Sequence, residues 1–372
     1  MPVEWSLMKD VGPGLIDYVY RTMQIDEEWS ARKSRSFTWW PHRLAQRVWA
    51  EPAIESRGFN ITKVSAETNL LRNVPGGPRT AEWLMTCNYH ATMSAFIWNP
   101  DDGHVRLHCS AYAHTETLAM IEKLFSCAVA LQAADAHIKV DGLAQLLGGE
   151  PDVSPHPISG PRPAMDDMIN VIELLFAPIG RGPAPFAPRD FESATRMQPQ
   201  PWREVATITN GLRALLHSVD FPEGTGILEA KGNEVHPQLG NGLLMLLSVP
   251  GPKGSFEDTL ALAHELNLQE ARDWTGHYFF GGWCVGPKPD NELTFAVFFP
   301  ARVCDPGLIE AMSLHMGGRA AWANDQIRGG QMETKAFLAS VKAGKEWSTP
   351  PSAVRRALTR ALEWDTRQGG TT

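Results

Sequence analysis

The sequence predicts an α+β fold made of two similar lobes, each an antiparallel sheet packed by helices, with further helices at the C-terminal end. Segments that alternate apolar and polar residues lie between segments of helical spacing, and turn residues bound both kinds. A proline- and glycine-rich stretch at 148–200 divides the chain. The order of elements before this stretch recurs after it, which indicates an internal repeat.

Composition limits the function classes. The 372 residues, 43% of them hydrophobic, suffice for two or three domains with ordinary cores. The formal net charge of −8 argues against a strongly basic nucleic-acid binder. No apolar run reaches the roughly 18 residues of a membrane span, and the N-terminus lacks the basic start and apolar core of a signal peptide. We therefore expect a cytoplasmic protein.

The N-terminal lobe is assigned to residues 1–147. Helices are expected at 14–24 and at 39–50, where Pro41 is tolerated in the first turn. Residues 58–74 alternate and carry β-branched side chains, which predicts one or two strands.

A hairpin is expected next, with strands at 82–98 and 104–114 around a turn at 99–103. In the return strand Val105, Leu107 and Cys109 point to one face, while the polar side chains, among them three histidines, share the other. One face is therefore predicted to be buried and the other to be solvated or in contact with something. A long helix is expected at 116–135.

Residues 148–200 are interpreted as a linker with one helix at 166–176, and residues 201–328 as the C-terminal lobe. Ser255 followed by Asp258 is typical of a capping box that opens a helix. The remaining predicted elements of this lobe are a helix at 202–218, strands at 240–249, 274–285 and 292–303, and a helix at 306–327.

A C-terminal helical extension is assigned to residues 329–372. Its last helix, 352–364, places apolar residues against a short basic face. This face consists of Arg355, Arg356 and Arg360, and it would suit docking on an acidic partner.

The two halves align at an offset of about 188 residues in the hairpin and 190 in the following helix. Leu107 aligns with Phe295 and Leu118 with Leu308. This alignment predicts a tandem duplication.

The order of elements in the second copy, from the helix SFEDTLALAHELN through the hairpin FFGGWCVGPKPDNELTFAVFF to the helix GLIEAMSLHMGGRAAWA, resembles the YbjN and type III secretion chaperone-like family. The resemblance covers about 202–327 and, more loosely, 39–136, where no helix is evident before the hairpin. It implies a bacterial protein-binding module that dimerises and holds an extended segment of a partner. The family has no catalytic signature, so it transfers no catalytic residue.

A search for chemistry finds no complete motif. His264-Glu265 lacks the second histidine of H-E-x-x-H, and no phosphate loop or nucleophile elbow is present. Five widely spaced cysteines without C-x-x-C are expected to be reduced. No cofactor and no catalytic residue is expected. The cysteines are Cys87, Cys109, Cys127, Cys284 and Cys304.

Three functions remain open. The first is a non-enzymatic protein-binding module, a chaperone-like or adaptor protein, for which the family resemblance implies a homodimer. The second is a metal-dependent hydrolase that uses a histidine-rich sheet face formed by His90, His108 and His114. The third is a structural subunit docked through the C-terminal helix. The expected partner-binding residues are Trp98, Tyr112, Trp283, Trp322, Arg355, Arg356 and Arg360.

Overall fold

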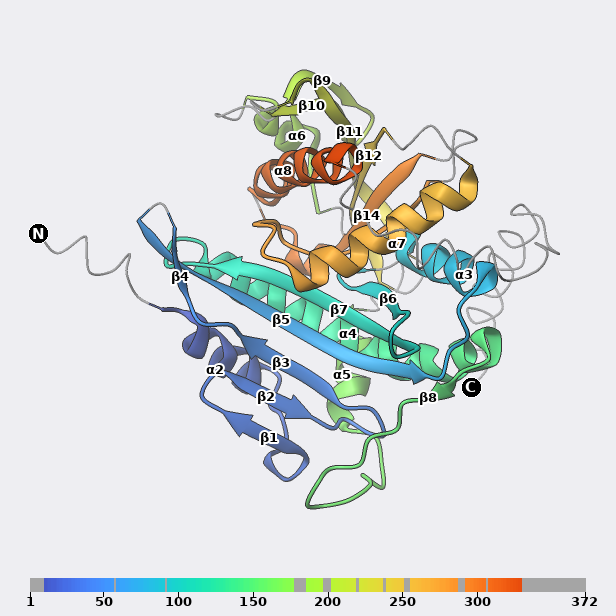
Figure 1. The fold of residues 1–372 in the computed structure, drawn as a ribbon. Coiled ribbons are helices and arrows are strands. Elements are labelled where there is room, and N and C mark those ends of the chain that lie inside the picture. The colour runs from blue at the N-terminus through green and yellow to red at the C-terminus, as the bar shows by residue number, and fades with distance from the viewer. Residues whose placement is uncertain are drawn as a thin grey trace, which may run out of the picture.

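The computed structural model describes residues 10–329, apart from 57, 91, 177–184, 197–201, 219–220, 237–238, 251–254, 287–291 and 306. Within these residues the chain forms two antiparallel sheets with helices packed on them (Figure 1). The predicted α+β class with two sheet lobes is confirmed. The predicted helix 352–364 lies outside the described residues. None of the helices in the described part is long and apolar enough to cross a membrane.

The first sheet has the strand order β1-β2-β3-β5-β7-β6, and two short strands, β4 and β8, pair with β5. Helices α2 and α4 pack on one of its faces, and α5 packs on α4. The strands are β1 (Ser30–Lys33), β2 (Ser36–Trp39), β3 (Gln46–Ala50), β4 (Ile54–Ser56), β5 (Phe59–Arg72), β6 (Ala95–Asn99), β7 (His104–Ala113) and β8 (Glu150–Pro151). The helices are α2 (Gly12–Thr22), α3 (Pro78–Tyr89), α4 (Leu118–Leu147) and α5 (Asp167–Phe176).

The second sheet has the order β9-β10-β11-β12-β14-β13, and α6 and α8 pack on one of its faces. The predicted capping box of Ser255 and Asp258 is present at the start of α7. The strands are β9 (Trp202–Ile208), β10 (Gly211–Ser218), β11 (Phe221–His236), β12 (Gly240–Val249), β13 (Gly282–Val285) and β14 (Leu293–Pro300). The helices are α6 (Pro188–Ala194), α7 (Phe256–Arg272) and α8 (Leu308–Gly329), and short 3-10 turns lie at Glu27–Trp29 and Ala301–Val303.

The two sheets repeat one topology. Apart from the short β4 of the first copy, each copy places four strands, a helix, two strands and a helix in the same order, so α3 corresponds to α7 and α4 to α8. The hairpin registers agree as well, because Phe96 pairs with Leu107 and Trp283 pairs with Phe295. The alignment of Leu107 with Phe295 is confirmed, and α3 supplies the helix that the sequence pattern did not reveal in the first copy.

Three predicted elements are wrong. Residues 39–50 do not form a helix, because β2 and β3 pair with each other and β3 pairs with β5. Residues 202–218 form the hairpin of β9 and β10, whose turn holds Asn210 at a φ of 53° before Gly211. Asn-Gly is a strong hairpin signal that the helical spacing obscured.

The first half of the predicted strand 82–98 is the helix α3. Pro78 occupies its first turn, where a missing N–H costs nothing, and Gly77 precedes it with a φ of 151°. Only β6, at Ala95–Asn99, belongs to the hairpin.

The copies pack against each other through corresponding elements. Helix α3 contacts α7 and β13, while α7 contacts β6 (Figure 1). Asn88 in α3 pairs with the backbone of Phe96, and Asn267 in α7 pairs with the backbone of Trp283. In both copies, therefore, an asparagine side chain forms hydrogen bonds with the backbone N–H and C=O at the equivalent edge-strand position.

One titratable group lies where α3 meets α7. Burial and the neighbouring charge of Glu257 raise the pKa of Glu82 to about 7, and no described group donates a hydrogen bond to the Oε1 atom of Glu82. The unfolded chain has the ordinary pKa of 4.5, so folding favours the protonated form. Stability is therefore expected to fall as the pH rises from about 4.5 to about 7.

Replacement of Glu82 by glutamine removes this penalty. We expect Glu82→Gln to raise the free energy of unfolding by about 1 kcal/mol at pH 8, after allowance for solvent screening of a half-buried group, and to have little effect near pH 4.5. Urea unfolding at the two pH values measures the difference, with Glu122→Gln on α4 as the matched control. An equal effect of Glu82→Gln at both pH values would contradict this account.

Candidate functional site

Each copy passes a connecting segment to the sheet of the other copy. The segment before β13 forms a two-way backbone bridge between Phe279 and Ser110 of β7, with N···O distances of 2.8 and 3.1 Å. The segment before β6 makes the corresponding contact, because Phe298 of β14 donates to the carbonyl of Thr92 at 3.3 Å. Ser110 and Phe298 occupy equivalent positions, so the exchange follows an internal twofold relation.

We name residues 273–281 the strap. It crosses the face of the first sheet that the helices leave open, and its two ends are held differently. At the first end, Lys63 donates to the carbonyl oxygens of Ala271 and Asp273 at 3.1 and 2.7 Å, and the Tyr112 hydroxyl accepts from Thr275 N–H at 2.8 Å. The C-terminal carbonyl groups of α7 attract a cation, so Lys63 also stabilises that helix end.

Glycines fit the other end of the strap against the second sheet. Gly281 has a φ of 94°, and a Cβ atom there would lie 2.2 Å from the carbonyl oxygen of Ala296. A Cβ atom on Gly282 would lie 2.9 Å from the side chain of Asn88. The Gly-Gly pair therefore lets the strap enter β13 where the two copies are in contact.

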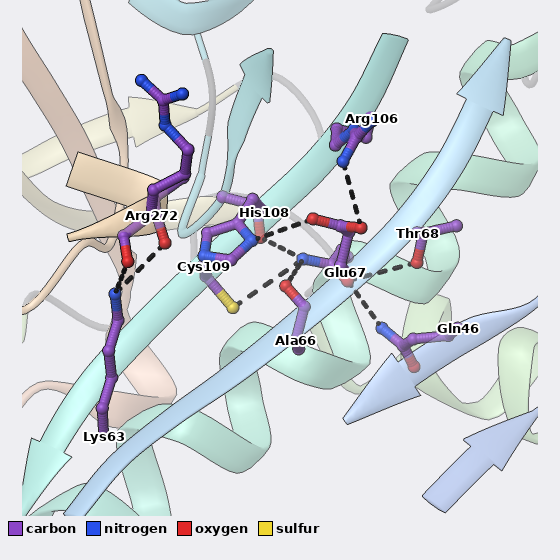
Figure 2. A network of polar contacts seen from close by, with 12 residues as sticks. Gln46, Lys63, Ala66, Glu67, Thr68, Arg106, His108, Cys109 and Arg272 are labelled. Atoms are coloured by element: carbon purple, nitrogen blue, oxygen red, sulfur yellow. Dashed lines mark hydrogen bonds and ion pairs between the residues drawn. The ribbon is translucent and has the colours of Figure 1, made fainter. Parts of the chain in front are cut away.

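A polar network lies on the sheet beneath the strap. Figure 2 shows the carboxylate of Glu67 between His108 and Arg106, with the Lys63 amino group reaching the backbone carbonyls near Arg272. The His108 Nδ1 atom lies 3.3 Å from Glu67, and its ring packs against Phe279 of the strap. The predicted polar face of β7 is thus a contact face within the chain.

The pKa values of Glu67 and Lys63 are both lowered, for different reasons. Burial acts to raise the pKa of Glu67, but the hydrogen bond from His108 and the positive charges of His108 and Arg106 outweigh it and hold that pKa below its usual value. Burial lowers the pKa of Lys63, and the negative charges of Glu51 and Asp273 oppose the shift. The Glu67 carboxylate is therefore held in its charged form beside Arg106 and His108.

The strap does not satisfy every polar atom it covers. The Nε2 atom of His108 and the hydroxyl oxygens of Ser65 and Ser110 are buried without a hydrogen-bond partner among the described residues. Ser65 and Ser110 are directly opposite each other on β5 and β7. Such atoms cost free energy when unpaired, so the face is adapted to hold a backbone segment rather than packed as an apolar core.

The three histidines of the predicted metal face do not converge. His90 follows the end of α3 and lies outside the hairpin, His108 pairs with Glu67, and His114 packs on Phe59. The expected register was wrong because residues 82–89 are helical. Among the described residues, no group of three or more histidine, cysteine or acidic side chains could hold a metal ion.

The aromatic residues expected to contact a partner lie inside the molecule. Trp98 donates to the carbonyl of Val74, Trp283 donates to Glu270, and Tyr112 is covered by the strap. All three are buried, and Trp322 is half-buried against the core. Their positions correct the expectation that they form a partner surface. The remaining expected contacts, Arg355, Arg356 and Arg360, lie outside the described residues.

The cysteines are poor nucleophiles in this fold. Burial raises the pKa of Cys87 to about 11 and that of Cys109 and Cys304 to about 12, and it also raises the pKa of Cys127 and Cys284. A thiol with a raised pKa stays protonated at neutral pH and does not act as a thiolate.

Surface hollows adjoin α4, and one of them is also lined by Arg302 and Val303 in the turn after β14. Two of them, of about 560 and 540 Å³, share Tyr18, Thr22 and Glu122. Their linings mix apolar side chains with charges of both signs, and Lys123 is already paired with Asp305. These hollows bring no pair of titratable groups together for catalysis.

Comparison with family models, curated proteins and solved structures gave no significant match. The functional argument therefore depends on the geometry of this chain. Sequence reasoning identified the polar face of β7 but missed Lys63, Thr92 and Phe279, which join the copies. The only sequence signal for this contact was the aromatic run before Gly281-Gly282, which was interpreted as part of a strand.

Proposed function

We propose that this chain is a non-enzymatic protein-binding module that holds a segment of a partner polypeptide as a chaperone-like or adaptor protein in the cytoplasm. The resemblance of the sequence to the secretion chaperone-like family supports this proposal. We also propose that the protein is bacterial and that it works in a secretion, defence or signalling assembly.

One observation carries the proposal. The first sheet holds the strap, a segment from the other copy, through a backbone bridge at Ser110, a lysine on carbonyl oxygens and a tyrosine hydroxyl on an N–H. These contacts are made to backbone groups of the strap rather than to a particular side chain. A sheet that holds a strand of its own chain in this way has the chemistry needed to hold a strand of another protein.

The enzyme alternative has no comparable support. The histidines are separated, and the cysteine thiols are held protonated. The resemblance implies a homodimer. In this chain the two copies already pack as a pair, so a second chain is less needed to form such a pair.

Affinity purification of the tagged full-length chain from its native host tests this function. We expect a stoichiometric protein partner that withstands a high-salt wash and that recovers this chain when the tag is moved to the partner. Light scattering should give a mass greater than that of the chain alone. A monodisperse, partnerless chain in both experiments would overturn the proposal.

A further inference from the structure

Two histidines lie where the strap packs on α8. His277 of the strap follows the bend at Gly276, which has a φ of 79°. A Cβ atom on Gly318 of α8 would lie 2.7 Å from the His277 ring, so the missing side chain leaves room for this ring on the helix. The next strap residue, Tyr278, packs on the ring of His315 of α8 with 3.6 Å between the ring centres. The contact between the strap and α8 therefore contains one imidazole from each side.

The surroundings of these two rings disfavour a proton on either of them. Arg319 of α8 donates to the carbonyl of Tyr278, and its charge is paired with Glu270 at 2.6 Å. Burial and the positive charge of Arg319 lower the pKa of His315 to about 3. Burial, Arg319 and His315 together hold the pKa of His277 well below its usual value. With the strap closed, both imidazoles are therefore neutral at neutral pH and at mildly acidic pH.

The carboxylates that face other parts of the strap have other partners. Glu51 and Asp273 act on the Lys63 amino group at the first end of the strap. Glu67, on the sheet beneath the strap, lies 3.3 Å from the Nδ1 atom of His108 (Figure 2). These acids therefore stabilise the end and the floor of the strap rather than a proton on either of the two rings at α8.

Release of the strap from α8 would return both imidazoles to water, where a histidine has a pKa of about 6.5. The released form then binds protons that the closed form does not bind, so closure weakens as the pH falls below about 6.5. Between pH 7.5 and pH 5.0 the ratio of released to closed strap should rise by about 30-fold for each histidine, and by about 10³-fold for the two together.

We propose that the strap is an acid-sensitive latch: protonation of His277 and His315 releases it from α8 and uncovers the polar face of the first sheet. The face favours release once the latch is weakened. The Nε2 atom of His108 and the hydroxyl oxygens of Ser65 and Ser110, which have no hydrogen-bond partner among the described residues, would then gain water. The proposal concerns a segment of this chain, so it does not depend on whether a partner protein binds.

Hydrogen exchange of the full chain, followed by mass spectrometry, tests the latch. The N–H groups of Phe279 and Ser110 are each bonded to the other residue's carbonyl, so peptides that contain them report release of the strap. After correction for the intrinsic exchange rate at each pH, we expect the protection of residues 273–281 to fall by about 10³-fold from pH 7.5 to pH 5.0. At pH 5.0 it should be lower than the protection of β12, which opens only when the second sheet unfolds.

Two variants assign the effect to the histidines. His277→Asn keeps a polar side chain, and His315→Phe keeps a ring for Tyr278 to pack on, but neither replacement can be protonated. Each variant should reduce the fall in protection from about 10³-fold to about 30-fold, and the double variant should abolish it. The matched control is His104→Gln at the start of β7, where the ring lies beside Asp102, and it should keep the full fall.

Three results would overturn the latch. Protection of the strap that is the same at pH 7.5 and pH 5.0 would show that its release is not linked to protons. Equal protection of the strap and of β12 at pH 5.0 would show that the strap opens only when the whole chain unfolds. An undiminished fall in folded His315→Phe and His277→Asn chains would assign the pH dependence to other groups.

Discussion

Replacement of Arg319 by methionine is expected to lower the free energy of unfolding by about 3–5 kcal/mol, the largest effect of any single change considered. Arg319 of α8 and Glu270 of α7 form an ion pair at 2.6 Å whose two side chains are inaccessible to solvent. The guanidinium also lies 3.8 Å from the centre of the Phe295 ring and donates to the carbonyl of Tyr278. Its removal leaves the Glu270 carboxylate buried with only Trp283 as a donor.

A double variant separates the loss of charge pairing from the loss of packing. Glu270→Gln in the Arg319→Met background removes the unpaired charge while an acceptor for Trp283 remains, so it should recover at least about 1 kcal/mol. Urea unfolding followed by tryptophan fluorescence measures both. The control is Arg272→Met, because Arg272 is exposed and lies 4.0 Å from Glu265, and it should cost less than about 0.5 kcal/mol. A cost for Arg319→Met as small as that of the control would contradict the argument.

The sequence predicted the repeat because hydrophobic alternation is a local property. Leu107 and Phe295 each sit within a hairpin whose turn residues and apolar spacing are visible in a short window. The predictions that were wrong concern elements whose structure depends on the strands that lie beside them. Residues 39–50 have helix-forming side chains, yet Val48 is drawn into the sheet by pairing with Phe37 and Ala66.

The candidate site was harder to predict because it depends on contacts between the two copies. Alternation in β7 showed that one face is polar, but it could not show whether water or another part of the chain covers that face. Ser110 meets Phe279, and Lys63 meets Asp273, across more than half of the described chain. Contacts between residues so far apart leave no pattern in a short window of the sequence. The prediction of a histidine-rich face was wrong for the same reason. It required residues 82–89 to pair as a strand with β7, and these residues form α3.

Alanine in place of Asn88 or Asn267 is expected to cost about 2–4 kcal/mol in each case. The two asparagines are fully buried, and each pairs with both the N–H and the C=O of an edge-strand residue. Strands β6 and β13 have no other strand on that side within the described residues. Loss of Asn88 therefore leaves the N–H and C=O of Phe96 unpaired in the interior, while loss of Asn267 leaves the N–H of Trp283 unpaired and its carbonyl with only the longer bond from Asn88; each orphaned group costs about 1–3 kcal/mol.

The double variant is expected to cost more than the sum of the single variants. The Trp283 carbonyl accepts from Asn267 at 2.9 Å and, more weakly, from Asn88 of the other copy at 3.4 Å. It is fully orphaned only when both side chains are removed, so an excess of about 0.5–1 kcal/mol should appear. Urea unfolding of the wild-type chain, the two single variants and the double variant completes this double-mutant cycle. The matched control is Asn99→Ala, beside the exposed turn that contains Asp101. Strict additivity would contradict the shared role of the Trp283 carbonyl and would mean that α3 and α7 stabilise their edge strands independently.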